Sequence, residues 1–84
     1  MEIYLLDEED NYMKLSVVSG NPFGVSWTSK VYKRSKDGKW DFVCRATFEC
    51  VFRTGVVLNI ENKNHKVSRY YIQKDIWLLN PQSI

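Results

Sequence analysis

The fold is decided by one stretch of the chain, residues 40–52, which reads WDFVCRATFECVF. Each even-numbered position in this stretch, from Trp40 to Phe52, carries an apolar residue, while most odd-numbered positions are polar. Because side chains alternate between the two faces of a strand, this pattern predicts a β-strand with one face buried.

The length of this stretch also constrains the fold. Thirteen extended residues would span about 43 Å, whereas a globule of 84 residues is only about 30 Å across. The strand must therefore coil or bend, and the small residue Ala46 is the expected place. A long strand shared by two halves of a curled sheet is what a small barrel requires. We therefore expect one all-β domain over residues 1–84, with six or seven mostly antiparallel strands in a strongly curled sheet or small barrel of SH3-like or OB-like size.

The turn before this stretch sets how it pairs with residues 25–36. Asp37-Gly38 favours a two-residue hairpin loop. A three-residue loop would instead turn Lys30, Tyr32 and Arg34 toward the apolar face. We therefore predict the two-residue loop, in which the outer face opposes Lys30 with Arg45, Tyr32 with Val43, Arg34 with Asp41 and Ser26 with Glu49.

The turn after the stretch favours a longer loop. If Arg53-Thr54-Gly55 forms a three-residue loop with Gly55 left-handed, apolar residues oppose one another, namely Phe52 and Val56, Cys50 and Leu58, and Phe48 and Ile60. This predicts a meander of strands over residues 25–36, 39–52 and 56–61. Further strands are expected at residues 2–6, 12–18 and 66–73, the last with an ambiguous inward face, followed by a short strand or helical turn over residues 74–79.

The charge of the chain is unevenly distributed. Twelve Lys and Arg residues against ten Asp and Glu residues give a net charge of +2. The first ten residues contain five acids and no base, so the rest of the chain carries twelve bases and five acids, a net charge of +7. Apolar runs such as Val56-Val57-Leu58 are far shorter than the ~20 residues that a membrane span needs. With no basic leader at the N-terminus either, we expect a small cytoplasmic protein without a membrane partner, and not a multidomain enzyme.

Residues suited to catalysis or metal binding are few. Cys44 and Cys50 form no CxxC motif and are expected to be buried, reduced thiols. The only histidine, His65, lies within residues 62–66, which read as a turn. The sequence contains no phosphate-binding glycine loop, no paired nucleophile and base, and no cluster of metal ligands. We therefore expect a non-enzymatic protein with no cofactor and no metal.

The outer face of the predicted central hairpin is basic and carries an aromatic ring. Lys30 faces Arg45 there, an arrangement of like charges that is mildly unfavourable and has no evident structural benefit. Lys and Arg neutralise phosphates, and aromatic rings stack on unpaired bases. An ordinary solvated strand face would also look like this. We predict non-catalytic binding of RNA or single-stranded DNA through Lys30, Tyr32, Lys33, Arg34, Lys36, Lys39, Arg45 and Arg69.

A second interpretation rests on the acidic N-terminal turn and on the aromatic residues. Four consecutive acids on a turn can meet a basic partner or fold over the chain's own basic face, although they can also simply keep an edge hairpin soluble. The twelve aromatic residues exceed what so small a core easily holds, unless the sheet has a second minor core. Exposed Tyr and Trp are typical interface anchors. This predicts a protein-interaction module, such as a small inhibitor, an adaptor or a homodimeric subunit, that uses Asp7, Glu8, Glu9, Asp10 and Trp77.

Overall fold

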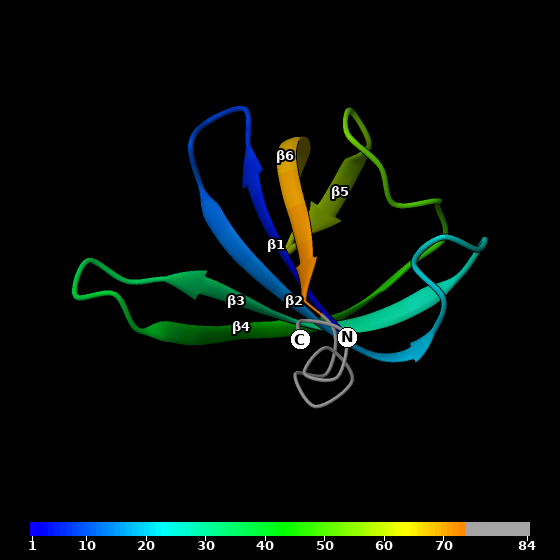
Figure 1. The fold of residues 1–84 in the computed structure, drawn as a ribbon, viewed down its shortest axis with the longest axis horizontal. Helices are drawn as coiled ribbons and strands as arrows, with labels where there is room; N and C mark the ends of the chain where they lie inside the picture. The colour runs from blue at the N-terminus through cyan, green and yellow to red at the C-terminus, as the bar shows by residue number, and fades with distance from the viewer. Residues whose placement is uncertain (74–84) are drawn as a thin grey trace, which may run out of the picture.

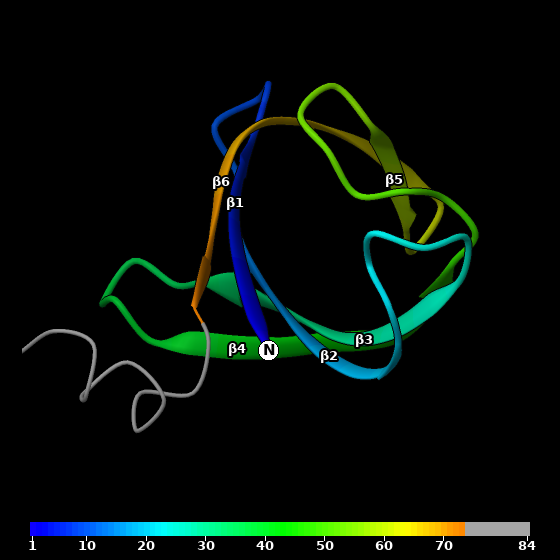
Figure 2. The same cartoon turned by 45° about the vertical axis from the view of Figure 1, so that its right-hand side comes forward.

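The computed structural model describes residues 1–73 as one sheet of six antiparallel strands. The strands are β1 (Glu2–Asp7), β2 (Tyr12–Gly20), β3 (Trp27–Arg34), β4 (Trp40–Phe48), β5 (Val57–Ile60) and β6 (Lys63–Gln73). Their order across the sheet is β4-β3-β2-β1-β6-β5. The sheet curls until its two edge strands, β4 and β5, come into contact, which makes a nearly closed barrel (Figures 1 and 2). The predicted all-β, strongly curled architecture is confirmed, while the element expected over residues 74–79 lies outside the described residues.

The inside of the barrel is filled by apolar side chains from alternate strand positions. The Trp27 ring packs against Phe48 and Phe52, with ring centroids 4.6 Å and 5.9 Å away. Its indole N–H donates a hydrogen bond to the Cys50 carbonyl at 2.7 Å, which satisfies the one polar atom of this buried ring. The core consists of Ile3, Leu5, Met13, Leu15, Trp27, Val31, Phe48, Phe52, Leu58, Ile60 and Val67.

The structure corrects the predicted partner of β5. Strand β4 ends at Phe48, and β5 pairs with β6, where Leu58 lies opposite His65. The predicted pairings of Phe48 with Ile60, Cys50 with Leu58 and Phe52 with Val56 are therefore wrong. Alternation along a strand shows which side chains are buried, but it does not identify the strand beside it, because any neighbour can cover the same apolar face.

The residues that were expected to extend this long strand form an irregular segment, 49–56. Its backbone is held from two sides, since the Phe52 amide donates to the Pro22 carbonyl at 2.7 Å and the Gly55 amide donates to the Val67 carbonyl at 2.8 Å. Gly55 has a φ of 89°, the left-handed conformation that the sequence predicts. The chain therefore leaves the sheet at β4 and rejoins it beside β6.

The β3–β4 hairpin confirms the predicted register at its base and corrects it at its tip. Near the barrel, Lys30 lies opposite Arg45, as predicted. At the tip, the Ser35 amide donates to the Lys39 carbonyl at 2.8 Å, and Gly38 has a φ of 84°. The loop thus has three residues with a left-handed glycine, in place of the predicted two-residue loop.

One extra residue in β4, Val43, accounts for the difference of one residue between the register at the tip of this hairpin and the register at its base. Tyr32 lies opposite Phe42, Arg34 lies opposite Trp40, and Val43 has no β3 residue opposite it, so both oppositions predicted for these β3 residues are wrong. Such a β-bulge shifts the side chains beyond it by one position. As a result Trp40 and Phe42, which the alternation predicts to be in the core, lie on the outer face.

A second bulge, at Ser68 of β6, resolves the ambiguous inward face of that strand. Val67 is buried on one side of the bulge, while beyond it Ile72 packs against the core and Tyr71 is exposed. A third bulge lies at Val18 in β2. Bulges bend a strand and increase its twist, so these three account for the tight curl of so short a sheet.

Two glycines with left-handed backbones, Gly20 at the end of β2 and Gly55 between β4 and β5, differ in the space around them. A Cβ added at Gly20 would lie 2.5 Å from the Ser26 carbonyl oxygen and 2.7 Å from Trp27 Cα, whereas nothing lies within 4 Å of a Cβ at Gly55. We expect Gly55→Ala to lower the free energy of unfolding by about 1 kcal/mol through backbone strain alone. Gly20→Ala should cost at least about 2 kcal/mol more, because backbone atoms must also move. Urea denaturation of both variants measures the difference, and equal losses would contradict it.

Candidate functional site

Eight residues on the outside of the barrel form one continuous surface, here called the aromatic–cation face. The register of the sheet places five of them in a single row of neighbours, which runs Tyr71, Tyr4, Lys14, Tyr32 and Phe42 across β6, β1, β2, β3 and β4. The complete face consists of Tyr4, Tyr12, Lys14, Tyr32, Arg34, Trp40, Phe42 and Tyr71.

Two cations hold the rings of this face together. Lys14 Nζ lies 4.7 Å from the centre of the Tyr32 ring and 5.4 Å from that of Trp40. The Arg34 guanidinium carbon lies 5.5 Å from the Tyr12 ring and 5.6 Å from the Trp40 ring. All four distances are within the range of cation–π attraction, so Trp40 lies beside two positive charges.

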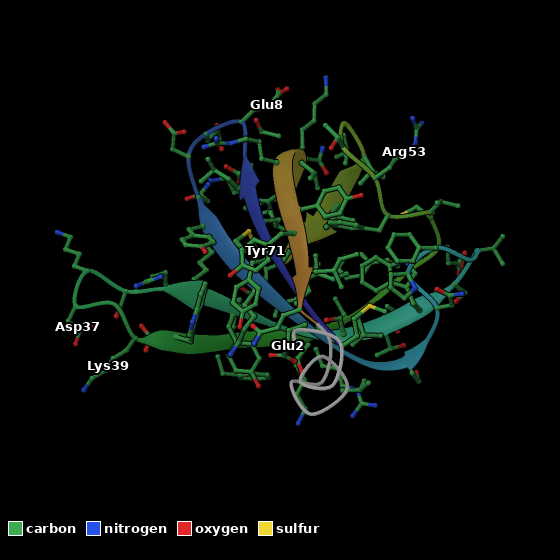
Figure 3. All side chains as sticks on the ribbon, viewed as in Figure 1. Glu2, Glu8, Asp37, Lys39, Arg53 and Tyr71 are labelled. Atoms are coloured by element: carbon green, nitrogen blue, oxygen red, sulfur yellow. The ribbon has the colours of Figure 1, made fainter. Side chains whose placement is uncertain are left out.

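The aromatic–cation face is folded into an angle. The Trp40 ring of β4 reaches to 5.8 Å from the Tyr4 ring of β1, although β2 and β3 lie between these strands. The β3–β4 hairpin projects sideways from the barrel, and Tyr71 lies in the angle between this hairpin and β6 (Figures 1 and 3). The Tyr71 ring is stacked on the Tyr4 ring, at 4.9 Å and 12°. The Tyr4 ring therefore supports the Tyr71 ring from one of its faces.

Several rings of the aromatic–cation face remain open to solvent despite these contacts. The exposed fraction is 58% for Phe42, 55% for Tyr71 and 37% for Tyr12. Tyr32 supports Phe42 edge-on, with ring centroids 5.6 Å apart. The sequence prediction that some aromatic residues must be exposed is therefore confirmed for these rings, which lie on one side of the sheet.

The predicted basic pair borders this face. Lys30 lies opposite Arg45 on one side and opposite Ser16 on the other, and all three are in the row next to Tyr32 and Lys14. Lys30 and Arg45 are both exposed. Glu2 continues this row on β1, opposite Ser16, and is engaged there, because it accepts a 2.6 Å hydrogen bond from Ser16 Oγ and lies 3.8 Å from Lys14 Nζ. The positive charge of the pair is therefore available to a ligand.

The other predicted basic residues are more scattered. Lys36 and Lys39 are exposed in the turn at the far end of the hairpin, where Lys39 is labelled in Figure 3. Lys33 lies opposite buried Met13 and so belongs to the other face of β3. Arg69 is exposed on the outside of β6, opposite Leu6. The structure thus brings Lys30, Tyr32, Arg34 and Arg45 together, places Arg69 at the opposite edge of the face, and leaves the three hairpin lysines outside it.

The acidic turn lies away from the basic pair. It joins β1 to β2 at the opposite end from Glu2, about 17 Å along the strand, as the positions of Glu2 and Glu8 in Figure 3 illustrate. Its exposed acids face β6 instead, since Glu8 lies 3.8 Å from Lys66 Nζ and Glu9 lies 3.4 Å from Lys63 Nζ. The chain therefore neutralises part of this turn by itself, and the turn does not fold over the predicted basic face.

Asp7 does not belong to the exposed part of the acidic turn, because its carboxylate is buried. One carboxylate oxygen accepts hydrogen bonds from the Glu9 and Asn11 amides at 2.9 Å and 2.8 Å. The other accepts one from the Asn11 side chain at 2.9 Å and lies 2.7 Å from His65 Nδ1. Burial raises the pKa of Asp7, but the hydrogen bonds from His65, Asn11 and Glu9 outweigh it and lower the pKa to about 2.

The histidine and the cysteines are placed differently from the sequence prediction. His65 is buried within β6 and not in a turn as predicted, and its Nδ1 is engaged by Asp7. Cys44 and Cys50 are free thiols as predicted, but half-buried where full burial was expected, and burial raises the pKa of both. Within residues 1–73, no three metal-ligating side chains gather at one place, and no helix is long and apolar enough to cross a membrane.

Comparison with protein families, curated proteins and solved structures finds no match for this chain. The functional interpretation therefore rests on the geometry of the described residues. Trp77, which the sequence assigns to a protein interface, lies outside them.

Of the eight residues of the aromatic–cation face, the sequence predicted only Tyr32 and Arg34 as site residues. Tyr4 and Lys14 carried a detectable signal, because each lies between two core residues of its strand and must point outward. Trp40 and Phe42 carried a misleading one, since they continue the apolar alternation of β4 and only the bulge at Val43 turns them out.

The Asp7 carboxylate leads to a prediction about acid stability. Because its pKa is about 2 in the folded chain against an ordinary 3.8, it stabilises the fold above pH ~4, and this contribution disappears as the pH falls toward 2. We expect Asp7→Asn to lower the free energy of unfolding at pH 7 by about 2 kcal/mol or more and to flatten its decline between pH 4 and 2. Asp10→Asn is the matched control, because Asp10 is exposed and its φ of 65° suits asparagine. Identical pH profiles of unfolding for the two variants would contradict this role of Asp7.

Proposed function

We propose that this protein is a non-catalytic binding module for single-stranded RNA or DNA, and that the aromatic–cation face and the Lys30–Arg45 pair form its binding surface. The observation that carries this proposal is the exposure of the Phe42 and Tyr71 rings, at 58% and 55%, beside exposed cations on one side of the sheet.

Exposed rings of this kind suit unpaired bases. A nucleobase that leaves a stack exposes two flat apolar faces, and stacking on an aromatic side chain contributes about 1–3 kcal/mol per base. Phe42 and Tyr71 are held edge-on by Tyr32 and face-on by Tyr4, so each presents a ring that is already oriented. Bases in a duplex are stacked on one another, which is why the proposal specifies a single strand.

The cations suit the backbone of the same strand. Lys30 and Arg45 face each other at the border of the rings, and like charges in opposed positions repel. A phosphate between them would turn this repulsion into attraction and release bound counterions. Arg34 offers a further positive charge within the face.

A protein-interaction module remains the second candidate, since exposed tyrosines also anchor protein interfaces. One observation favours it, namely the width of the aromatic–cation face, which extends over five strands. The acidic turn supports it less than the sequence suggests, because Glu8 and Glu9 already lie beside Lys66 and Lys63. We rank it second because Lys14 stands in the middle of the row of rings, and charged residues, lysine among them, are depleted at the centres of protein interfaces.

A salt titration tests the electrostatic half of the proposal. We expect the logarithm of the association constant for a mixed-sequence oligonucleotide pool to fall linearly with the logarithm of the salt concentration. Lys30→Gln combined with Arg45→Gln should reduce this slope by about 1.4, since each phosphate contact on a single strand contributes about 0.7. Lys63→Gln combined with Lys66→Gln removes the same charge beside the acidic turn and should leave the slope unchanged. Absence of binding at low salt, measured by fluorescence anisotropy, would refute the proposal.

The stacking half is tested by changing rings without changing charge. Phe42→Leu and Tyr71→Leu should each weaken binding at least about fivefold at constant salt slope, because a stacked base is lost while phosphate contacts remain. Phe23→Leu is the matched control, because Phe23 is 45% exposed but lies in the loop between β2 and β3. If these variants bind like the wild type while light scattering shows a dimer that Phe42→Leu disrupts, the face is a protein interface instead.

A further inference from the structure

A hollow of about 420 Å³ opens on the outside of the barrel at one edge of the aromatic–cation face. It lies where β1 and β6 run side by side, and the start of β2 completes its wall. Its lining residues are Tyr4, Leu5, Leu6, Tyr12, Arg69, Tyr70 and Tyr71. Three of them, Tyr4, Tyr12 and Tyr71, also belong to the aromatic–cation face, so the hollow continues that surface.

The lining has an unusual composition for so small a depression. The outward-facing side chains of Tyr4, Leu6, Tyr12 and Tyr71 give it apolar, mostly aromatic walls, whereas Leu5 and Tyr70 face the inside of the barrel. Among residues 1–73, Arg69 is its single charged group. The register places Arg69 directly opposite Leu6, next to the bulge at Ser68. The guanidinium therefore stands at an aromatic depression, and a planar group that enters the hollow would meet rings and one positive charge.

The tyrosine hydroxyls add hydrogen-bonding capacity. Partial burial, together with the nearby Glu2 carboxylate and Tyr12, raises the pKa of Tyr4, so its hydroxyl remains a donor at neutral pH. Tyr71 is 55% exposed on the outer face and can turn its hydroxyl to a ligand. Such groups can tell the edges of different bases apart, whereas an open stacking ring accepts every base alike.

We propose that this hollow holds one nucleotide of the bound strand, with its base among the tyrosines and its phosphate at Arg69, and that base preference arises there. This inference rests on the proposed function. Pockets for small ligands measure about 300–1,000 Å³, so the hollow is of a size for one nucleotide rather than several. A bound strand would then run from the Lys30–Arg45 pair across the aromatic–cation face to Arg69. Its bases would stack on the exposed rings along this path, and the hollow beside Arg69 would select one base by type.

Filling the hollow provides the most direct test. Leu6 is half-buried in its lining, so Leu6→Trp occupies the space while it leaves every charge and every ring of the aromatic–cation face in place. We expect the wild type to bind ten-nucleotide oligomers of rA, rU, rC and dT with different affinities. Leu6→Trp should weaken the preferred oligomer about tenfold, equalise the four affinities and keep the salt slope.

Arg69→Gln tests the phosphate contact without altering the apolar wall. It should weaken binding about tenfold and reduce the salt slope by about 0.7, the contribution of one phosphate. Arg53→Gln is the matched control, because it removes the same charge from an exposed residue on the far side of β6 (Figure 3). It should bind like the wild type, and Arg69→Gln decides the question even if Leu6→Trp does not fold.

Different results would contradict the proposed function and the proposed role of the hollow. If the wild type binds none of the four oligomers at low salt, the proposed function itself is wrong. If the wild type binds them but shows no base preference, or if Leu6→Trp and Arg69→Gln bind each oligomer as tightly as the wild type, only the hollow is wrong.

Discussion

The extra residue Val43 controls which way the aromatic residues of β4 face. A regular strand of the same residues, without this bulge, would place Trp40 and Phe42 on the inside, on the same apolar face as Cys44. With it, both rings lie outside, where Trp40 meets the cations of β2 and β3 and the Tyr4 ring of β1. The aromatic–cation face therefore depends on one local irregularity in an otherwise regular hairpin.

That irregularity is coupled to the turn at the tip of the hairpin. A three-residue loop with Gly38 left-handed starts the β3–β4 pairing one residue away from the register that the core requires. The bulge absorbs the mismatch before the hairpin enters the barrel, so Lys30 and Arg45 still face each other. The tip and the base of the hairpin therefore differ in register by one residue, and the bulge at Val43 joins the two registers.

The charges of the molecule are likewise divided between its two ends. Asp7 is buried against His65 and organises the β1–β2 turn, while its acidic neighbours lie beside lysines of β6. Glu2, at the other end of β1, is engaged by Ser16 and Lys14. Glu2, Asp7, Glu8 and Glu9 are thus engaged by groups other than Lys30 and Arg45, and the basic pair on the outer face keeps its positive field. A net charge of +2 conceals this separation.

The sequence by itself determined the all-β class, most strand positions, the outward direction of Lys30 and Arg45 and the left-handed Gly55, because alternation and turn chemistry act over a few neighbouring residues. Only the tertiary structure decided that β5 pairs with β6, that His65 is buried against Asp7 and that Trp40 joins Tyr4. These outcomes bring together residues from distant parts of the chain. They depend on how the barrel curls and where its bulges fall, and no local pattern of residues encodes either.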